Sequence, residues 1–583
     1  MINENTVEQQ AIAWFQEAGW SYVHGSKLMP DASPDQRTDG RSVVLAGRFT
    51  DAICHLNPQL PPEVVEEVAR VALQPEHPDL SRANAAFHRK LVDGVPVVYT
   101  DASGEKQQDV ARLVDFADAK NNDWLVVNQL AVSGTKGGRR PDIVCYINGL
   151  PISVIELKNP ADKNADIWAA YRQLQTYKDE IGDLFLTNEA LVVSDGITAR
   201  VGSLTASPEW FMPWRTLASE SDTPVVEYEL ERVVRGFFRP DLLLDYLRYF
   251  VLFEGEEDVV KKIAGYHQFH GVRAAVDETL KATKHDGKAG VFWHTQGSGK
   301  SISMAMYAGR LLQQPGMRNP TLVVVTDRND LDGQLFGQFA AAKALLREAP
   351  EQADSREQLR EYLDGRQSGG IIFTTVQKFS PMQGEETHPV LSERSNIVVI
   401  SDEAHRSQYG IKPRLDQKTG KYVYGYAKHL RDALPKASFI GFTGTPISTE
   451  DRDTRGVFGE YVSVYDIADA VEDGATVQIY YESRRAKLDL NQGEIDRLNE
   501  EVEEVVEDEE VEGREKTKSQ WTQLAKLVGA QPRLEAIADD LLKHFDDRRE
   551  AMEPQIGADG GKAMIVTMSR DICVALYDDI VKR

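Results

Sequence analysis

The stretch AGVFWHTQGSGKS, residues 289–301, decides the fold of the middle of this 583-residue chain. An apolar run leads into a turn with two glycines, and a helical stretch follows. Such glycines let backbone N–H groups approach phosphate oxygens, and the helix dipole favours their negative charge. Lys300 would reach the β- and γ-phosphates and Ser301 would bind Mg²⁺, which predicts a P-loop for ATP and Mg²⁺. The strict pattern has glycine in place of His294, so a flexible Gly/Ser turn is the alternative. The predicted binding residues are Gly297, Ser298, Gly299, Lys300 and Ser301.

Similar apolar runs recur from residue 266 to about 446. Short apolar runs separated by helical stretches are typical of a parallel sheet that is covered on both faces. One run, NIVVIS (396–401), ends at Asp402 and Glu403. The first carboxylate could hold Mg²⁺ through water, and the second could orient the attacking water. Gln268, shortly before the P-loop, could read the adenine edge.

A second constellation lies upstream, where Asp142 is followed after thirteen residues by Glu156-Leu157-Lys158. Both acids lie on predicted strands, DIVCYI (142–147) and PISVIEL (151–157), and can converge on one Mg²⁺. Lys158 emerges on the same strand face as Glu156 and can stabilise developing negative charge. The spacing is that of a PD-(D/E)xK nuclease. An exposed charge pair on a strand is the alternative for Glu156 and Lys158.

Two further features resemble RecB-type nucleases. Gln173 and Tyr177 match that family's QxxxY helix motif and lie on one face of a predicted helix, 165–181. Glu8, in a predicted opening helix (5–18), occupies the position where the family often supplies another acid. A solvated helix face is the equal alternative for Glu8.

Other segments give weaker signals. The turn GTKGGRR (134–140) is a plausible phosphate-contact loop, although any surface turn could look like this. Residues 28–60 are rich in Pro, Asp and Gly and are predicted to be irregular, and EGEED (254–258) is a plausible domain boundary. KAMIVTM (562–568) is predicted to be a strand. The basic residues of the turn are Lys136, Arg139 and Arg140.

The P-loop followed by Asp-Glu-Ala-His resembles helicase superfamily 2. Thr443 and Thr445, in the sequence TGTP, match the motif that in this family couples nucleotide state to DNA grip. Arg328 and Thr374 fall where the family contacts the strand backbone of DNA. Plain sheet structure is the alternative for the threonine-rich strand end at Thr374.

The combination of nuclease and motor resembles the restriction (R, HsdR) subunit of type I restriction-modification enzymes. The resemblance runs in the family's order through ENTVEQQAIAWFQEAGW, RRPDIVCYINGLPISVIELKNP, YHQFHGV, WHTQGSGKS, SDEAHRSQYG, GFTGTPI and VEDGATVQIYYESR. It implies an α/β fold with a restriction-endonuclease-like (RecB-type) domain at 1–255 and a RecA-like P-loop ATPase domain at 256–465. A linker with an acidic insert and the start of a second RecA-like domain follow at 466–583.

The resemblance also implies partners: double-stranded DNA, and separate methylation (M) and specificity (S) subunits. The subunit would translocate DNA with ATP and cleave it at a distance, and S-adenosylmethionine would enter only through the partner methyltransferase. Family members are considerably longer. We therefore expect an N-terminal fragment, monomeric alone, that binds ATP and Mg²⁺ but hydrolyses ATP poorly and does not translocate.

Composition adds limits. The charge is 67 − 92 = −25, which argues against a polybasic coat but leaves room for a basic groove. The acidic run 494–515 is interpreted as a solvated helix or loop, with a DNA mimic and a regulatory insert as alternatives. Three scattered cysteines favour a reducing compartment. With no leader pattern and no apolar stretch of about 20 residues, we expect a cytoplasmic protein without a membrane span.

Two rival functions stay open at this point. One is the motor-nuclease of another restriction class or of a DNA-repair system, which would cut bare DNA independently. The other is a nucleotide-gated DNA-binding module whose nuclease site is inert, in which case substitution of Asp142 or Lys158 would change nothing.

Overall fold

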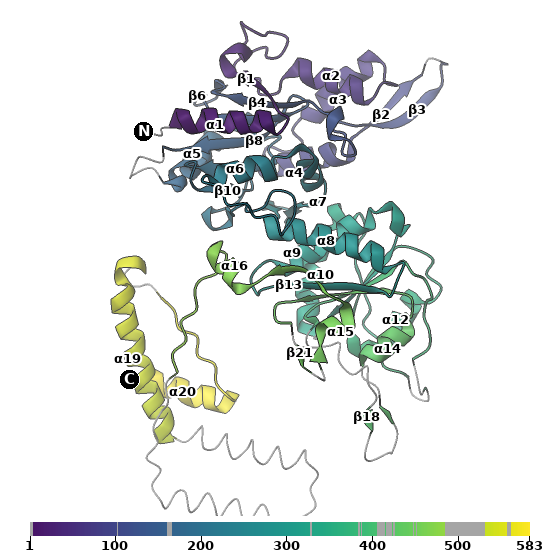
Figure 1. The fold of residues 1–583 in the computed structure, drawn as a ribbon, viewed down its shortest axis with the longest axis vertical. Coiled ribbons are helices and arrows are strands. Elements are labelled where there is room, and N and C mark those ends of the chain that lie inside the picture. Colours follow the sequence, from purple (N-terminus) through teal and green to yellow (C-terminus); the bar gives the residue numbers. More distant parts are fainter. Residues whose placement is uncertain are drawn as a thin grey trace, which may run out of the picture. The chain divides into compact units, whose positions relative to one another are not determined.

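The computed structural model forms two compact units, Met1–Val477 and Gln478–Arg583 (Figure 1). No described helix is long and apolar enough to cross a membrane. The residues that the structure describes are 4–101, 103–159, 166–326, 329–382, 385, 388–404, 414–415, 422–423, 426–446, 448–449, 452–483, 531–556 and 561–583.

A six-stranded sheet organises the N-terminal part of the first unit, in the order β1-β4-β7-β8-β9-β10. The β1–β4 and β8–β9 pairs are parallel, and β4–β7, β7–β8 and β9–β10 are antiparallel. The predicted α/β character of this region is confirmed. The strands are β1 (Ser21–His24), β4 (Trp124–Asn128), β7 (Ile143–Ile147), β8 (Leu150–Leu157), β9 (Ala190–Ser194) and β10 (Ala199–Gly202).

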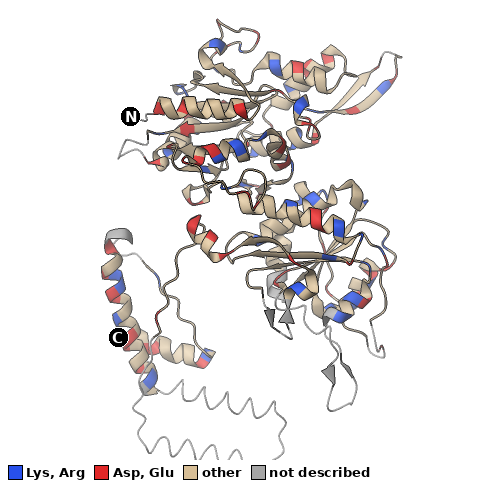
Figure 2. Ribbon diagram, in the orientation of Figure 1, with Lys and Arg blue, Asp and Glu red and all other residues tan. Residues whose placement is uncertain are grey.

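Both faces of this sheet are covered by apolar clusters. Alternate residues of a strand point to opposite faces, so Ile143 and Cys145 pack with helix α1 (Glu4–Glu17), while Val144 and Tyr146 pack with α5 (Ile167–Glu180). Every residue of β7 and β8 is buried, and in Figure 2 the strands of this sheet carry few charged residues. A polar side chain on these strands is therefore buried, and its burial is costly unless it forms hydrogen bonds.

The remaining elements of this part are short helices and ribbons. Residues 28–60 were predicted to be irregular, but they include helix α2, because its apolar residues Phe49, Ile53 and Leu56 are buried in or beside the first apolar cluster. The elements are α2 (Ala46–Leu56), α3 (Pro62–Leu73), α4 (Leu80–Asp93), β2 (Val95–Thr100), β3 (Lys106–Ala111), β5 (Val132–Gly134), β6 (Gly137–Arg139), α6 (Glu229–Arg232), α7 (Pro240–Tyr249), β11 (Val251–Glu254) and β12 (Val260–Ile263).

A seven-stranded sheet follows in the order β15-β16-β14-β17-β20-β13-β23, and all of its pairs are parallel. The predicted parallel sheet is thereby confirmed. Its strands are β13 (Lys288–His294), β14 (Thr321–Thr326), β15 (Glu351–Gln352), β16 (Ile371–Thr375), β17 (Ile397–Ser401), β20 (Ser438–Thr443) and β23 (Tyr461–Tyr465). Its helices include α8 (Tyr266–Ala282), α9 (Lys300–Leu312), α10 (Asn329–Ala341), α11 (Lys343–Leu346), α12 (Arg356–Leu363), α14 (Tyr426–Ala433), α15 (Thr454–Phe458) and α16 (Ile467–Glu472).

One apolar cluster runs through both sheets of the first unit, and the Phe250 and Phe269 rings meet in it with centroids 4.7 Å apart. Ion pairs reinforce this junction, among them Arg273–Asp245 at 2.9 Å and Arg215–Glu472 at 2.5 Å. The predicted boundary at 254–258 lies in the turn of the β11–β12 hairpin. The division of the chain at 255 and 465 stays a prediction.

In the second unit, α19 (Gln531–Ile556) packs on α20 (Arg570–Lys582) through Leu534, Ala538, Ile572 and Leu576. The predicted strand at 562–568 is wrong, because no strand forms there. Met564 and Val566 are 89% and 83% exposed. A strand needs a neighbour to pair its backbone groups, and no described residue pairs with this segment. The acidic run 494–515 lies outside the described residues.

Candidate functional site

The predicted carboxylate–lysine site is brought together on the first sheet. Asp142 directly precedes β7 and Glu156 lies in β8, where Ile143 is paired with Ile155. One oxygen of Asp142 accepts a 2.8 Å hydrogen bond from the Leu157 N–H. Lys158 Nζ donates to Glu156 Oε1 at 3.1 Å. Two buried acids and one lysine therefore share one edge of the antiparallel pair.

Helix α5 completes this site as the QxxxY spacing predicts. Gln173 Oε1 accepts from Lys158 Nζ at 2.8 Å, and Gln173 Nε2 donates to the Tyr177 hydroxyl at 2.6 Å. The Tyr177 hydroxyl is 3.5 Å from Glu156 Oε1. Gln173 therefore orients the ammonium group of Lys158, and Tyr177 closes the ring of contacts back to Glu156.

Glu8 also belongs to this site. It is buried, and its two oxygens accept hydrogen bonds from Asn128 Nδ2 at 2.6 Å and Gln129 Nε2 at 2.5 Å. Gln129 Nε2 also lies 3.4 Å from Asp142 Oδ1. The solvated-face alternative for Glu8 is therefore wrong. Sequence reasoning missed Asn128 and Gln129, although a polar pair directly after the apolar run WLVV was an available signal.

Burial gives the two acids unusual proton affinities. Burial, with smaller contributions from the charges of Glu4 and Glu8, raises the pKa of Asp142 to about 6. The hydrogen bond from the Leu157 N–H and the charge of Lys158 act in the opposite direction and lower this pKa. Burial and the charge of Asp142 raise the pKa of Glu156 to about 8 although Lys158 opposes the shift. Glu156 Oε2 is buried and has no hydrogen-bond partner among the described residues. A buried polar atom without a partner is costly.

These features fit a divalent cation. Mg²⁺ is usually held by one or two carboxylates together with water and substrate phosphate, and a cation would offset the repulsion between Asp142 and Glu156. In the described parts of the chain, no three His, Cys, Asp or Glu residues form a group that could hold a metal. The pair alone offers the ligand number that Mg²⁺ commonly takes from protein.

The buried carboxyl group of Glu156 predicts a pH-dependent stability. Its raised pKa favours the protonated form, so its stabilising contribution is lost as pH rises through about 8. We expect Glu156→Gln to stabilise the metal-free chain by roughly 2–4 kcal/mol at about pH 9 and to give no gain at about pH 4. Urea unfolding in a chelator at both pH values measures this difference. An equal effect at both pH values would contradict the assignment of a buried, ionising carboxyl group.

The basic turn lies beside this site on the β5–β6 hairpin. Lys136, Arg139 and Arg140 are exposed, and the two arginines line an open depression of about 670 Å³ together with Gln173 and Tyr177. The Arg139 guanidinium is paired with Glu180, with one contact at 2.8 Å. Lys136 and Arg140 form no ion pair among the described residues, so they carry the phosphate-contact hypothesis.

The P-loop has the backbone that its glycines predict. Gly297 and Gly299 have φ of 84° and 81°, in the left-handed region that favours glycine, and α9 begins at Lys300. A Cβ at Gly299 would lie 2.8 Å from Gln268 Nε2. Ser298 Oγ donates to Thr295 O at 2.6 Å, which closes the turn. Ser301 lies in the first turn of α9.

The Gln268 carboxamide contacts the backbone of the P-loop and its neighbours. Its Nε2 donates to Gly299 O and to Ser303 Oγ, both at 3.2 Å, and its Oε1 accepts from Gly265 N at 3.0 Å. The carboxamide therefore supports the P-loop backbone. Contact with an adenine stays a prediction.

Asp402 and Glu403 follow β17 as predicted. Burial and the charge of Glu403 raise the pKa of Asp402 to about 6, while Lys300 opposes the shift. Asp402 N donates to Val325 O at 2.9 Å, which places the turn beside β14. Glu403 has φ of 43°, an uncommon backbone conformation for a residue with a side chain. The structure thus groups Asp402 and Lys300 at the carboxyl end of the parallel strands.

The TGTP motif contacts the P-loop. A Cβ at Gly444 would lie 3.1 Å from Lys300 Nζ, so a side chain at this position would require Lys300 to shift by a few tenths of an ångström. Thr445 N donates to Thr443 Oγ1 at 3.1 Å. The coupling role of Thr443 and Thr445 stays a prediction. Thr374 is fully buried in β16 and offers no surface to DNA in this structure, and Arg328 lies outside the described residues.

His294 occupies the position where the strict P-loop pattern has glycine. It is fully buried at the end of β13, where its Nε2 lies 2.6 Å from Ser463 Oγ and its ring lies 4.0 Å from that of Phe292. Burial, and to a lesser degree His267 and Lys300, hold the pKa of His294 well below its ordinary value. His294 is therefore a neutral core residue at the end of the strand that leads into the P-loop.

The fold and both sites define a class: a P-loop ATPase domain joined to an α/β domain with a carboxylate–lysine site. Family models agree, since the N terminus of type I restriction enzyme R proteins matches residues 1–210 and the SWI2/SNF2 ATPase matches residues 267–514. Each match covers less than half of the chain, and the first is a likeness to the R proteins of type I restriction enzymes.

Individual relatives show the same likeness. The type I restriction enzyme HindI endonuclease subunit of Haemophilus influenzae is 48% identical over 100% of this chain and 54% of its own length. A Methanocaldococcus jannaschii protein, named as the type I restriction enzyme MjaIXP endonuclease subunit, is 36% identical over 100% of this chain and 55% of its own. The chain thus spans about half the length of these curated relatives.

Among solved structures, a fragment of an HsdR subunit from Vibrio vulnificus YJ016 aligns with 60% of this chain and 56% of its own. The TM-score is 0.24 and the identity 16%, too low to carry an argument.

Proposed function

We propose that this chain is the DNA-cleaving and ATP-driven part of a type I restriction endonuclease. The observation that carries the proposal is the pair of buried acids, Asp142 and Glu156, with the half-buried Lys158 that Gln173 orients, in a chain that also carries the P-loop. A structural ion pair would not need two buried acids with raised pKa values beside an unpartnered carboxylate oxygen.

At the nuclease site, each residue has a separate role. Asp142 and Glu156 would hold Mg²⁺, with Glu8 as a further acid behind them. When bound, the ion would supply a Lewis acid for the scissile phosphate. Lys158 would stabilise the negative charge that develops on the phosphate, and its contacts to Glu156, Gln173 and Leu157 O restrict its movement. Lys136 and Arg140 would contact the flanking phosphates.

At the ATP site, backbone N–H groups of the P-loop and Lys300 would bind the phosphates, and Ser301 and Asp402 would hold Mg²⁺. Glu403 would orient the attacking water. Gly444 lies close to Lys300, since a Cβ there would be 3.1 Å from Lys300 Nζ, so the segment of Thr443 and Thr445 could respond to the position of the phosphates. This contact would link hydrolysis to the grip on DNA.

The remaining assignments are also proposals. The first domain has a RecB-type nuclease fold, the second is RecA-like, and residues 466–583 lead into a second RecA-like domain. Double-stranded DNA and the M and S subunits are the partners, and S-adenosylmethionine acts through the methyltransferase. The cytoplasm is where such a substrate is met. This chain alone would bind ATP and Mg²⁺ but translocate poorly.

The test is Mg²⁺-dependent nicking of supercoiled DNA by the enzyme assembled with M and S subunits. Asp142→Ala and Lys158→Ala are each expected to reduce nicking roughly 100-fold, because each removes a group that acts on the reacting phosphate. Lys106→Ala, at an exposed position, is the control. Equal nicking by all four proteins would leave an inert nuclease site as the better function.

A further inference from the structure

A cavity of about 520 Å³ lies where α4, the β11–β12 hairpin and the α10–α11 segment meet. It is distinct from both sites described above, since none of their residues lines it. The lining residues that matter here are Arg82, His88, Arg89, Phe253, Gln313 and Lys343. Cavities of this size accept small organic ligands.

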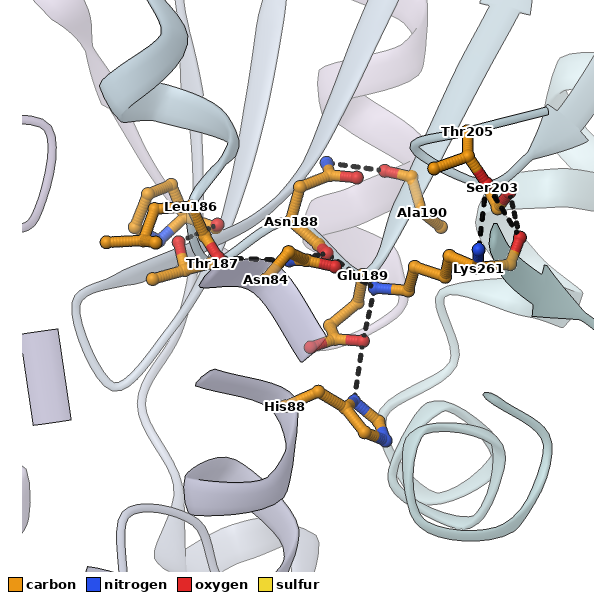
Figure 3. A network of polar contacts seen from close by, with 11 residues as sticks. Asn84, His88, Leu186, Thr187, Asn188, Glu189, Ala190, Ser203, Thr205 and Lys261 are labelled. Carbon is orange, nitrogen blue, oxygen red and sulfur yellow. Dashed lines mark hydrogen bonds and ion pairs between the residues drawn. The ribbon is translucent and has the colours of Figure 1, made fainter. Parts of the chain in front are cut away.

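A buried polar network lies next to this cavity and reaches it through His88 (Figure 3). Lys261, on β12, is fully buried, and its ammonium group donates three hydrogen bonds. The acceptors are Glu189 Oε2 at 2.9 Å, Asn188 O at 2.6 Å and Asn84 Oδ1 at 3.1 Å. All three ammonium hydrogens are therefore satisfied, the condition under which a buried charge is tolerated.

His88 is the member of the network that reaches the cavity. Its Nδ1 lies 2.9 Å from Glu189 Oε2, the same oxygen that accepts from Lys261. An ionised carboxylate only accepts, so Nδ1 carries the hydrogen. Nε2 has no hydrogen-bond partner among the described residues. The network thus holds one imidazole in a fixed orientation and leaves its second nitrogen for a ligand.

The cavity is basic in an acidic chain. Five cations line it against two acids, Asp93 and Glu256, although the net charge of the chain is −25. Arg347 is offset by Asp93 at 2.7 Å. The other four cations form no ion pair among the described residues, and they are Arg82, Arg89, Arg248 and Lys343. A local excess of positive charge favours an anionic ligand.

The other walls suit an apolar, flat group. Phe253 faces the cavity, and its ring centroid lies 5.3 Å from that of His88. Ala340, Ala341 and Ala342 add further apolar lining. Gln313 Oε1 and Arg248 Nε are buried lining atoms without a hydrogen-bond partner. A ligand that satisfies such atoms recovers the cost of leaving them unpaired.

We propose that this cavity binds a nucleotide, with its phosphate on Arg89 and Lys343 and its base between Phe253 and the alanine wall. The nucleotide is either free in solution or one unit of a DNA strand, because both present the same phosphate and flat base. This site goes beyond the proposed cleavage and ATPase functions, and it lies at the junction between the two sheets.

The experiment uses the chain with Lys300→Ala, which removes the P-loop lysine, and compares two double variants. Arg89→Gln with Lys343→Gln alters the cavity, whereas Lys106→Gln with Lys284→Gln removes the same charge from exposed positions elsewhere. Fluorescence anisotropy measures binding of labelled AMP and ATP in one arm and of a short labelled single-stranded oligonucleotide in the other.

The cavity variant is expected to weaken binding by about tenfold or more in at least one arm, since charge-assisted contacts to phosphate are lost. An effect with AMP or ATP identifies a free nucleotide as the ligand. An effect with the oligonucleotide only identifies a DNA strand. The proposal is overturned when neither arm separates the cavity variant from the control or when neither probe binds. ATP binding by the chain with and without Lys300→Ala tests the P-loop separately.

Discussion

The Lys261→Met variant is expected to have a free energy of unfolding about 3–5 kcal/mol lower than that of the parent chain. Methionine fills a similar volume, but it leaves Glu189 buried without its cation and removes the donor to Asn188 O and Asn84 Oδ1. An uncompensated buried charge is among the most destabilising changes known for single substitutions. Urea unfolding followed by tryptophan fluorescence measures the difference.

Two control variants separate the effect of the buried charge from the effect of losing any lysine. Lys281→Met breaks an exposed ion pair with Glu278 and should change stability by less than about 1 kcal/mol. The double variant Lys261→Met with Glu189→Leu should recover much of the loss, because no unpaired charge remains. A single variant as stable as the parent would show that Glu189 is not held as a buried anion.

Mn²⁺, used as a probe for Mg²⁺, is expected to bind the Asp142–Glu156 pair about 1000-fold more weakly at about pH 5.5 than at about pH 8.5. The pKa values are about 6 for Asp142 and about 8 for Glu156. Above the higher value both carboxylates are ionised. Below the lower value both hold a proton that the metal must displace, so affinity falls as pH falls.

Isothermal titration of the nucleotide-free chain measures this affinity. The double variant Asp142→Asn with Glu156→Gln is the reference. The binding heat that the parent chain shows and this variant lacks is assigned to the Asp142–Glu156 site. The single variant Asp142→Asn should flatten the part of the profile below about pH 6. It should also move the part near pH 8 to lower pH, because the charge of Asp142 no longer raises the pKa of Glu156. A pH-independent affinity in the parent chain would contradict metal binding by buried carboxylates.

Local sequence patterns predicted much of this protein. The turn at Gly297 and Gly299 adopts the left-handed backbone that the P-loop requires, and the apolar runs from β13 to β20 form one parallel sheet. The i, i+4 spacing of Gln173 and Tyr177 placed Gln173 beside Lys158 and Tyr177 beside Glu156. Such patterns succeed because they depend on neighbours close in sequence.

Other features depend on residues far apart. The segment at 562–568 has the composition of a strand, but no described residue pairs with it. Gln268 is hydrogen-bonded to Gly299, 31 residues away, so its amide supports the loop. Glu8 is buried by contacts with Asn128 and Gln129, about 120 residues later, and a helix pattern alone cannot separate that outcome from a solvated face.

By itself, the sequence determined which chemistry the chain carries: a phosphate loop, a pair of acids with a lysine, and the strands that hold them. Only the tertiary structure decided which polar groups lose contact with water. Lys261 and Glu189 stand 72 residues apart and look like ordinary surface charges in sequence, yet they meet in the interior and orient His88 toward a basic cavity. The physical reason is that the free energy of a charged group depends on its burial and its partners, and long-range packing sets both.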